Sequence, residues 1–331
     1  MTLQIVFVYL GDKIPRYALN NIKLTQKTFP DNLVTVVVNS EELHSKLTKF
    51  GVSAFRLDLS EESKSINYSH FDLTFRKSFW RYSSERLFAL LEFQALNKLP
   101  RIFHLELDVL LLPSFPFERT LTSPKIIWGA VSEDQDAAAM LYIPSLESGA
   151  WLLNELHSKY ASGKYSDMTA LRDISLDNPE IVSYFPLLFL NETQGEYKDN
   201  REFVNDAFLD SDRFDAATLG MYLTGTDPRN NKALSTLYKV PNGHWGLPNS
   251  IKYKFAGKNL HAILSEEKSY TIHNLHVHSK NNFLFKSNYW LLQLFIQLSR
   301  FNHSLHLLYP NHFFTGIFRV TKKRFKSSAK N

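Results

Sequence analysis

The chain of 331 residues is 44% hydrophobic and 14% aromatic and carries a formal net charge of +5. This composition provides a core for one large α/β domain or two smaller ones and excludes a wholly disordered chain, and the mild positive excess falls short of a nucleic-acid-type surplus. Cysteine is absent, which excludes disulfides, thiolate metal sites and cysteine nucleophiles. Any metal must therefore be held by Asp, Glu, His or water, which favours Mg²⁺ or Mn²⁺.

The first apolar segment, residues 3–10, lacks the basic start and the small-residue cleavage site of a signal peptide, so we expect it to form a strand. No segment is long and apolar enough to span a membrane, and we therefore expect a cytoplasmic protein. The basic tail, residues 322–326, is either solvated or makes a weak contact with an anionic membrane, which would make the protein peripheral to that membrane.

Segments of alternating type follow the first strand. Their predicted types and ranges are helix 15–28, strand 33–38, helix 41–50 and strand 52–57. This alternation with short connections is typical of a mostly parallel sheet flanked by helices. Ligands of such sheets bind beyond the carboxyl ends of the strands, where Asn39 and Asp58 lie.

A polar, serine-rich segment, residues 60–76, predicts a loop, and residues 79–96 predict a helix that ends before Pro100. Arg86 lies on this helix among apolar neighbours. It is either a surface cation or a partly buried arginine close to the acidic strand that follows, and the helical pattern alone does not decide between the two.

Two carboxylates, Glu106 and Asp108, stand in the otherwise apolar run 103–113. The run predicts one strand buried on both faces and ended by Pro113. At positions i and i+2 the two acids would share one face of the extended chain. Because an ionised carboxylate is costly inside such a strand unless it is compensated, we expect the strand to end here at a sheet edge, where both acids meet a metal. The alternative is a surface strand with two solvated acids.

Residues 125–131 and 137–143 predict two strands that flank the acidic turn 133–136. The turn is either a solvated hairpin loop or a loop that reaches a substrate, in which case Asp134 is the residue of interest. Helices are predicted for residues 148–160 and 166–174, and the segment 175–212 has no assignment.

Asp215 is expected to be the N-cap of a short helix that ends near Gly225. Further on, Trp245 lies in a Gly/Pro-rich loop and suits either packing or sugar stacking. His276 and His278 alternate with apolar residues, so both imidazoles would share one face of a strand. Such a pair is either structural or part of a metal site. An amphipathic helix is predicted for residues 287–302.

Taken in order, these segments resemble nucleotide-sugar glycosyltransferases of the GT-A fold, over roughly residues 1–285. The sequence Glu106-Leu107-Asp108 stands where that family has its D-x-D motif, and His276 or His278 stands where a late histidine completes the metal site. The first acid is Glu rather than Asp, so the resemblance assigns direct metal binding to Asp108. It assigns Glu106 to the ribose, or to the metal through water.

The resemblance implies a GT-A-like α/β fold with a mostly parallel central sheet flanked by helices. A Rossmann-like nucleotide-sugar-binding half, residues 1–112, would join an acceptor half, residues 113–285. A C-terminal helix and the basic tail would follow in residues 286–331.

The resemblance also implies roles for individual residues. Mn²⁺ or Mg²⁺ would be held by Asp108, Glu106 and His276 or His278. The nucleotide and its diphosphate would be contacted by Tyr9, Asn39, Arg86, Glu106 and Lys280. If the reaction inverts the sugar, Asp215 is the first candidate for the general base and Asp134 the second.

The implied activity is transfer of a hexose or pentose from a nucleoside-diphosphate donor to a hydroxyl of a glycan or glycoconjugate. A UDP-sugar is favoured, with GDP- and dTDP-sugars as alternatives, and no nucleic acid is expected as a partner. One rival is a glycoside hydrolase, which needs two carboxylates on either side of the scissile bond. The other is a catalytically inactive protein that binds nucleotide or sugar.

Overall fold

The structure is a computed structural model, and it describes residues 3–68, 70–75, 78–132, 134–187, 204–224, 252–263, 265–286 and 292–294. The helices of this part are α1 (Arg16–Thr28), α2 (Glu41–Lys49), α3 (Glu61–Lys64), α4 (Phe79–Leu96), α5 (Phe117–Thr120), α6 (Leu146–Ala161), α7 (Asp167–Asp177) and α8 (Thr218–Thr224). The strands are β1 (Gln4–Tyr9), β2 (Leu33–Val38), β3 (Ser53–Arg56), β4 (Ile102–Leu105), β5 (Val109–Leu111), β6 (Ile126–Ser132), β7 (Gln135–Ile143), β8 (Val182–Tyr184), β9 (Asp212–Arg213), β10 (Lys252–Ala256), β11 (Asn259–Ile263), β12 (Ser269–Ile272) and β13 (Asn274–His276).

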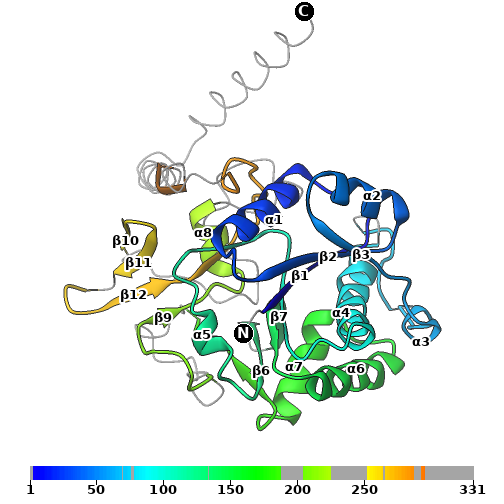
Figure 1. The fold of residues 1–331 in the computed structure, drawn as a ribbon. Helices are drawn as coiled ribbons and strands as arrows, with labels where there is room; N and C mark the ends of the chain where they lie inside the picture. Colours follow the sequence, from blue (N-terminus) through cyan, green and yellow to red (C-terminus); the bar gives the residue numbers. More distant parts are fainter. Residues whose placement is uncertain are drawn as a thin grey trace, which may run out of the picture.

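The centre of the molecule is a seven-stranded sheet in the order β3-β2-β1-β4-β7-β6-β8. Only β7 runs antiparallel to its neighbours, so the carboxyl ends of the other six strands lie along one edge. Helices α1 and α2 cover one face, and α4, α6 and α7 cover the other (Figure 1). The predicted mixed α/β class, with a large and mostly parallel sheet flanked by helices, is confirmed.

Two smaller sheets complete the fold. Strands β10, β11, β12 and β9 form a four-stranded sheet, and β13 pairs antiparallel with β5. The side chains that they bury form a second core with α8, separate from the core around the central sheet. Strand β5 therefore connects the part of the chain that carries the central sheet to the later part that carries β13.

The run 103–113 is not one strand, as the sequence analysis expected. Strand β4 ends at Leu105, the chain turns, and β5 begins at Val109. The backbone N–H of Val109 donates to the carbonyl of Glu106 at 3.1 Å and closes the turn. The acids are thus placed by a turn at the sheet edge and not by alternation along an extended strand. A strand end was expected here, but the expected continuation to Pro113 was wrong because a buried strand cannot accommodate two uncompensated carboxylates.

Two other expectations need correction. The segment 60–76 contains a short helix, α3, because Ser60 caps it by accepting the N–H of Ser63 at 3.2 Å. The acidic turn 133–136 is a hairpin loop only in part, since Asp136 belongs to β7 and is fully buried. Its Oδ2 accepts hydrogen bonds from Trp128 and Tyr184, both at 2.8 Å, so it is a core residue.

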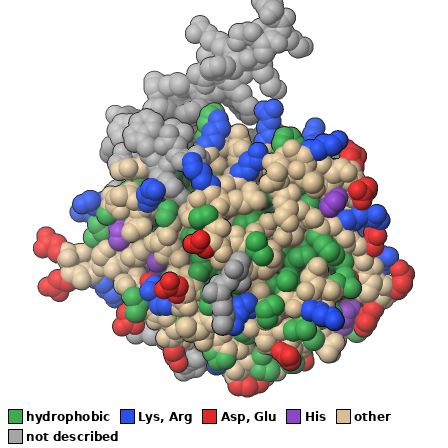
Figure 2. All heavy atoms as spheres, viewed as in Figure 1, with side chains coloured by type: hydrophobic (Ala, Val, Ile, Leu, Met, Phe, Trp, Pro, Cys, Tyr) green, Lys and Arg blue, Asp and Glu red, His purple; other side chains and the backbone are tan. Residues whose placement is uncertain are grey.

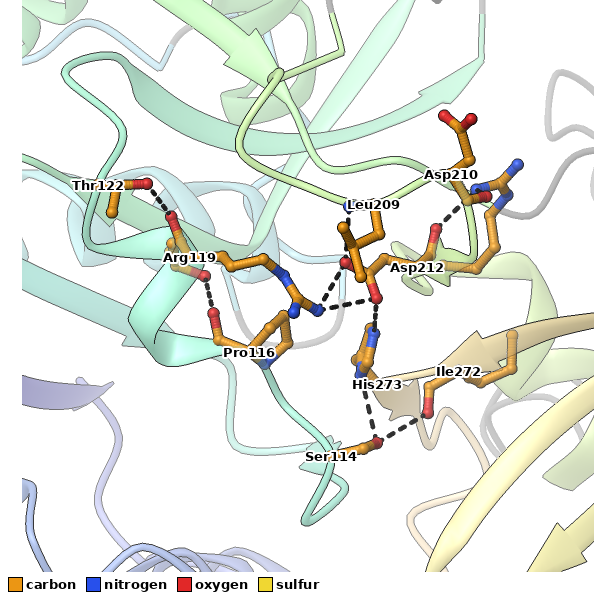
Figure 3. Close-up of polar contacts among 11 residues, drawn as sticks. Ser114, Pro116, Arg119, Thr122, Leu209, Asp210, Asp212, Ile272 and His273 are labelled. Carbon is orange, nitrogen blue, oxygen red and sulfur yellow. Dashed lines mark hydrogen bonds and ion pairs between the residues drawn. The ribbon is translucent and has the colours of Figure 1, made fainter.

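A buried polar network holds the segment after β5 to strand β9 and to His273, the residue between β12 and β13 (Figure 3). Asp212 accepts two hydrogen bonds from one guanidinium nitrogen of Arg119, at 2.9 and 2.7 Å, and contacts His273 Nε2 at 2.8 Å. The other ring nitrogen of His273 contacts Ser114 Oγ at 3.2 Å. Because a lone carboxylate would be costly at this depth, these contacts make Asp212 compatible with burial.

Several expectations fall outside the described residues. These are the loop around Trp245, the end of the short helix near Gly225, the predicted helix 287–302 apart from residues 292–294, and the tail 322–326. Among the helices that the structure describes, none has the length and apolar character needed to cross a membrane. Basic and acidic side chains are both spread over the face shown in Figure 2, without a field of a single sign.

Candidate metal centre

The candidate site lies at the carboxyl edge of the central sheet, where β4 ends. The turn after β4 carries Glu106 and Asp108, and α1 holds this turn in place through Asn21. The Asn21 amide donates to the carbonyls of Leu107 at 3.1 Å and Val109 at 2.7 Å. Strand β13 then lies antiparallel to β5 with His276 opposite Val109, which brings the imidazole beside both acids.

The three side chains converge on one point. His276 Nε2 lies 3.4 Å from Glu106 Oε2 and 3.4 Å from Asp108 Oδ1. His276 Nδ1 lies 2.6 Å from the carbonyl oxygen of Ala216. A carbonyl oxygen only accepts hydrogen bonds, so Nδ1 carries a proton and Nε2 is the nitrogen that faces the carboxylates.

Two cations and a third acid surround this point. Arg86 contacts Glu106 at 2.6 Å and Asp167 at 3.6 Å, and its side chain is 16% exposed. Lys280 Nζ lies 3.3 Å from Asp108 Oδ2. The sequence left open whether Arg86 was a surface cation, and the structure places it partly buried beside the acidic turn.

Electrostatics keep both acids of the turn ionised. Burial raises the pKa of Glu106, but the charge of Arg86 and the contact with His276 outweigh it and lower that pKa to about 2. Burial likewise opposes ionisation of Asp108, and His276 and Lys280 hold its pKa well below the ordinary value. For His276, burial disfavours the charged imidazolium, yet Asp108 and Glu106 raise its pKa well above the ordinary value. The place between the three groups therefore attracts positive charge.

The donor set fits a divalent metal ion. Glu106, Asp108 and His276 are the one group of three acidic or histidine side chains, among the residues that the structure describes, whose ligand atoms lie within 4.8 Å of one another. Two neighbouring ligands of one ion with bonds of about 2.1–2.4 Å lie roughly 3.0–3.4 Å apart. The two separations of 3.4 Å between His276 Nε2 and the carboxylate oxygens lie at the upper end of this range. Carboxylate and imidazole ligands without sulfur suit a hard or borderline divalent ion.

His278 does not belong to this group. Its ring stacks on that of His276, with centroids 3.9 Å apart and an interplanar angle of 23°. Burial and the neighbouring His276 lower the pKa of His278 to about 3, so it is neutral at ordinary pH. The strand expected to carry both imidazoles ends at His276, and His278 lies in the turn that follows it. Only His276 faces both carboxylates.

The other predicted site residues lie at varying distances from the cluster. Tyr9 ends β1 at the same sheet edge and donates from its hydroxyl to the carbonyl of Lys13 at 2.7 Å. Asn39 follows β2, is exposed, and donates to the carbonyl of Leu10 at 3.3 Å. Asp134 lies in the hairpin after β6, also at this edge, and is exposed.

Asp215 lies behind His276 and is buried. Its carboxylate accepts the backbone N–H groups of Leu219 and Gly220 in the first turn of α8 and so caps this helix, but from three residues before Thr218 and not as the N-cap residue that the sequence suggested. The same carboxylate also accepts the backbone N–H of His276. Burial raises the pKa of Asp215, while these N–H groups and the charge of His276 oppose the increase. No described residue besides Asp215 joins both α8 and His276 in this way through its side chain.

Sequence reasoning missed Asp167, Asn21 and the Ala216 carbonyl. Asp167 looks like an ordinary acid at a helix start, and its contact with Arg86 links segments about eighty residues apart. Asn21 lies on the buried face of α1, where a lone amide among apolar residues was the available signal. A backbone carbonyl carries no sequence signal at all.

No protein-family model matches the chain, and no curated protein matches it in sequence. Among solved structures, the galactosyltransferase LgtC in complex with donor and acceptor sugar analogues is 19% identical, over 56% of this chain and 73% of that one, with a TM-score of 0.37. The PaToxG glycosyltransferase is 14% identical over 52% of this chain and 64% of that one, with a TM-score of 0.34. A cytidylyltransferase from Leptospira borgpetersenii is 13% identical over 56% of this chain and 75% of that one, with a TM-score of 0.31. At these identities and TM-scores the overlap is limited to part of the fold.

Proposed function

We propose that this protein is a metal-dependent glycosyltransferase. It moves a sugar from a nucleoside-diphosphate donor, a UDP-sugar in the first instance, to a hydroxyl of a glycan or glycoconjugate. The observation that supports this is the convergence of Glu106, Asp108 and His276 between Arg86 and Lys280, at the edge of a mostly parallel sheet. Ligands of such sheets bind at that edge.

The residues divide into three tasks. Asp108, Glu106 and His276 would hold Mn²⁺ or Mg²⁺, which when bound supplies positive charge beside the negative charge that develops on a diphosphate leaving group. Lys280 has three donors on a rotatable ammonium and can contact a phosphate oxygen as well as Asp108. Arg86 keeps Glu106 ionised and oriented through the 2.6 Å contact.

The nucleoside end of the donor would lie along the neighbouring strand ends. Tyr9 ends β1 and Asn39 follows β2 on the same edge as the cluster, and neither side chain is fully buried. An aromatic ring and an amide at this place suit a base and a ribose hydroxyl. If the reaction inverts the sugar, Asp134 after β6 is our candidate for the general base, because it is exposed at this edge whereas Asp215 is buried.

The geometry does not favour a glycoside hydrolase. Hydrolases place two carboxylates on either side of the scissile bond, roughly 5 to 9.5 Å apart. Here the ligand oxygens of Glu106 and Asp108 lie within 4.8 Å of each other, and both face the same nitrogen of His276. Two acids that converge on one buried point cannot flank a sugar linkage.

Removal of Asp108 provides the test. We expect Asp108→Ala to abolish Mn²⁺-dependent binding of UDP, measured by calorimetry, while the thermal transition of the folded protein persists. Asp177→Ala is the matched control, because Asp177 is an exposed acid paired with Lys159 at the end of α7, which leads into the amino end of β8 at the opposite edge of the sheet. Unchanged UDP binding in Asp108→Ala would refute the proposal.

A thermal-shift screen of UDP-, GDP- and dTDP-sugars, each with and without Mn²⁺, would identify the donor. Turnover of a donor by the wild-type chain would exclude an inactive binding protein. Metal-dependent stabilisation by nucleotide without any turnover would instead support that alternative.

A further inference from the structure

His276 is held from behind by the segment 215–220. Asp215 Oδ2 accepts the backbone N–H of His276 at 2.7 Å and that of Gly220 at 2.7 Å, and Oδ1 accepts the N–H of Leu219 at 3.0 Å. Since Gly220 and Leu219 lie in the first turn of α8, one carboxylate joins the start of this helix to the backbone of the histidine. Asp215 as a whole residue is 2% exposed.

The same segment also holds the imidazole. The carbonyl of Ala216 accepts a hydrogen bond from Nδ1–H of His276 at 2.6 Å, which leaves Nε2 directed at Glu106 and Asp108. One residue therefore fixes the backbone of His276, and the next fixes its ring and its tautomer.

Asn274 completes the connection. Its side-chain amide donates to the Asp215 carbonyl at 2.7 Å, and its side-chain oxygen accepts the Asp215 N–H at 2.9 Å. Asn274 and His276 lie two positions apart on β13, so they share one side of the strand. This side of β13 is thus bound to the 215–220 segment at both positions, through four hydrogen bonds.

Gly220 allows α8 to lie close to the backbone of β13. A Cβ placed on Gly220 would overlap the carbonyl oxygen of His276, and it would lie 2.8 Å from Asp215 Oδ2. Any side chain here would push α8 away from β13, because the atom it meets belongs to the backbone and cannot rotate aside. The glycine is therefore a requirement of this contact and not of helix formation.

We propose that residues 215–220 form a positioning clamp for the metal-binding histidine, with Asp215 as its central positioning residue. The clamp fixes the place of His276 and the tautomer in which Nε2 is available to a metal. This inference rests on the proposed metal-dependent function. It assigns to Asp215 a role different from that of the general base that the sequence suggested, since the carboxylate is buried and accepts three backbone N–H groups.

The experiment compares Asp215→Asn and Gly220→Ala with wild type by Mn²⁺ calorimetry. Outer-shell partners of metal ligands are typically worth 10- to 100-fold in metal affinity, and we expect a loss of that size in both variants. Gly51→Ala is the control for general strain: Gly51 has φ of +73°, and no atom lies within 4 Å of the position that a Cβ would take, so this variant strains the backbone far from His276. We expect it to bind Mn²⁺ as wild type does.

A second readout does not need metal or activity. In wild-type protein labelled with ¹⁵N-histidine, we expect a slowly exchanging Nδ1–H signal for His276 and strong protection of its backbone amide against hydrogen exchange. Both should weaken in Asp215→Asn and Gly220→Ala. Absence of the slow Nδ1–H signal from wild type would overturn the clamp even if neither variant folds.

The outcomes separate the two proposals. If wild type binds no Mn²⁺ but shows the protected Nδ1–H and amide, the metal-dependent function fails and the clamp stands as a structural feature of His276. If wild type binds Mn²⁺ and both variants bind it within about threefold of wild type, with unchanged exchange at His276, the metal site stands and the clamp is overturned.

Discussion

Asp136 gives the sharpest test of the electrostatics of the fold. It is fully buried in β7, and its Oδ2 accepts hydrogen bonds from Trp128, Ser175 and Tyr184 at 2.8 to 2.9 Å. Arg172 lies 3.8 Å from the other oxygen. Burial outweighs all of these contacts and raises the pKa of Asp136 from 3.8 to about 6.

This shift makes stability depend on pH in a defined direction. Between pH 4 and 6 the folded protein holds a proton on Asp136 that the unfolded chain has released, so the free energy of unfolding falls as the pH rises through this window. A difference of about two pKa units corresponds to about 3 kcal/mol. The stabilising contribution is complete below pH 4 and is lost above pH 6.

The perturbation is Asp136→Asn, which keeps the size of the side chain and removes the titration. The assay is urea denaturation from pH 4 to 7.5, with wild type and variant compared at each pH so that other carboxylates cancel. We expect the difference in unfolding free energy to change by about 3 kcal/mol in favour of the variant as the pH rises. A flat difference for Asp136→Asn would refute the reasoning.

Two further predictions concern individual contacts. His276→Ala should abolish Mn²⁺ binding in calorimetry. His278→Ala should weaken Mn²⁺ binding by about tenfold or less, because His278 only stacks on the metal-binding His276. Equal losses in the two variants would mean that both histidines bind metal. Arg119→Met should lower the free energy of unfolding by about 1.5–3 kcal/mol in urea, because it removes two hydrogen bonds to the buried carboxylate of Asp212. An unchanged urea midpoint would show that His273 alone compensates Asp212.

The sequence was sufficient for the order of the first five elements, β1 to β3, and for α4. Helical periodicity located α4 at residues 79–96, and apolar runs and helical spacing located the shorter elements β1 to β3. The mostly parallel sheet then followed from alternation alone. The local sequence pattern does not reveal a buried charge whose hydrogen-bond partners come from other segments of the chain. Asp136 has such partners in Trp128, Ser175 and Tyr184, and for that reason it looked like part of a solvated turn.

The candidate site was predictable only in its parts. Two acids in an apolar run, and two histidines at alternate positions, are anomalies that a single sequence can display. The turn that presents the acids was not predictable, because it depends on Asn21 of α1 reaching the carbonyls of Leu107 and Val109. Nor could the sequence choose between His276 and His278, since that choice depends on which side chain lies opposite the turn.

That choice is a matter of strand register. His276 pairs with Val109, and the N–H of Val277 donates to the carbonyl of Asp108 at 2.7 Å. Leu275 and Val277 are fully buried on the other side of β13, in the second core. A slip of one residue would turn His276 into that core and direct an apolar side chain at the two acids.

The three-residue pairing of β13 with β5 is short, and burial of Leu275 and Val277 opposes a slip of one position but not a slip of two, which would exchange His276 for His278 or Asn274. Only a contact specific to one residue on the polar side can distinguish these registers. The reciprocal hydrogen bonds between Asn274 and Asp215 are such a contact, because a histidine cannot reproduce both the donor and the acceptor of the amide at that position. The segment 215–220, which positions the imidazole of His276, therefore also selects His276 over His278 as the histidine that faces Glu106 and Asp108. The contacts of this segment with β13 thus determine both the strand register and the geometry of the site.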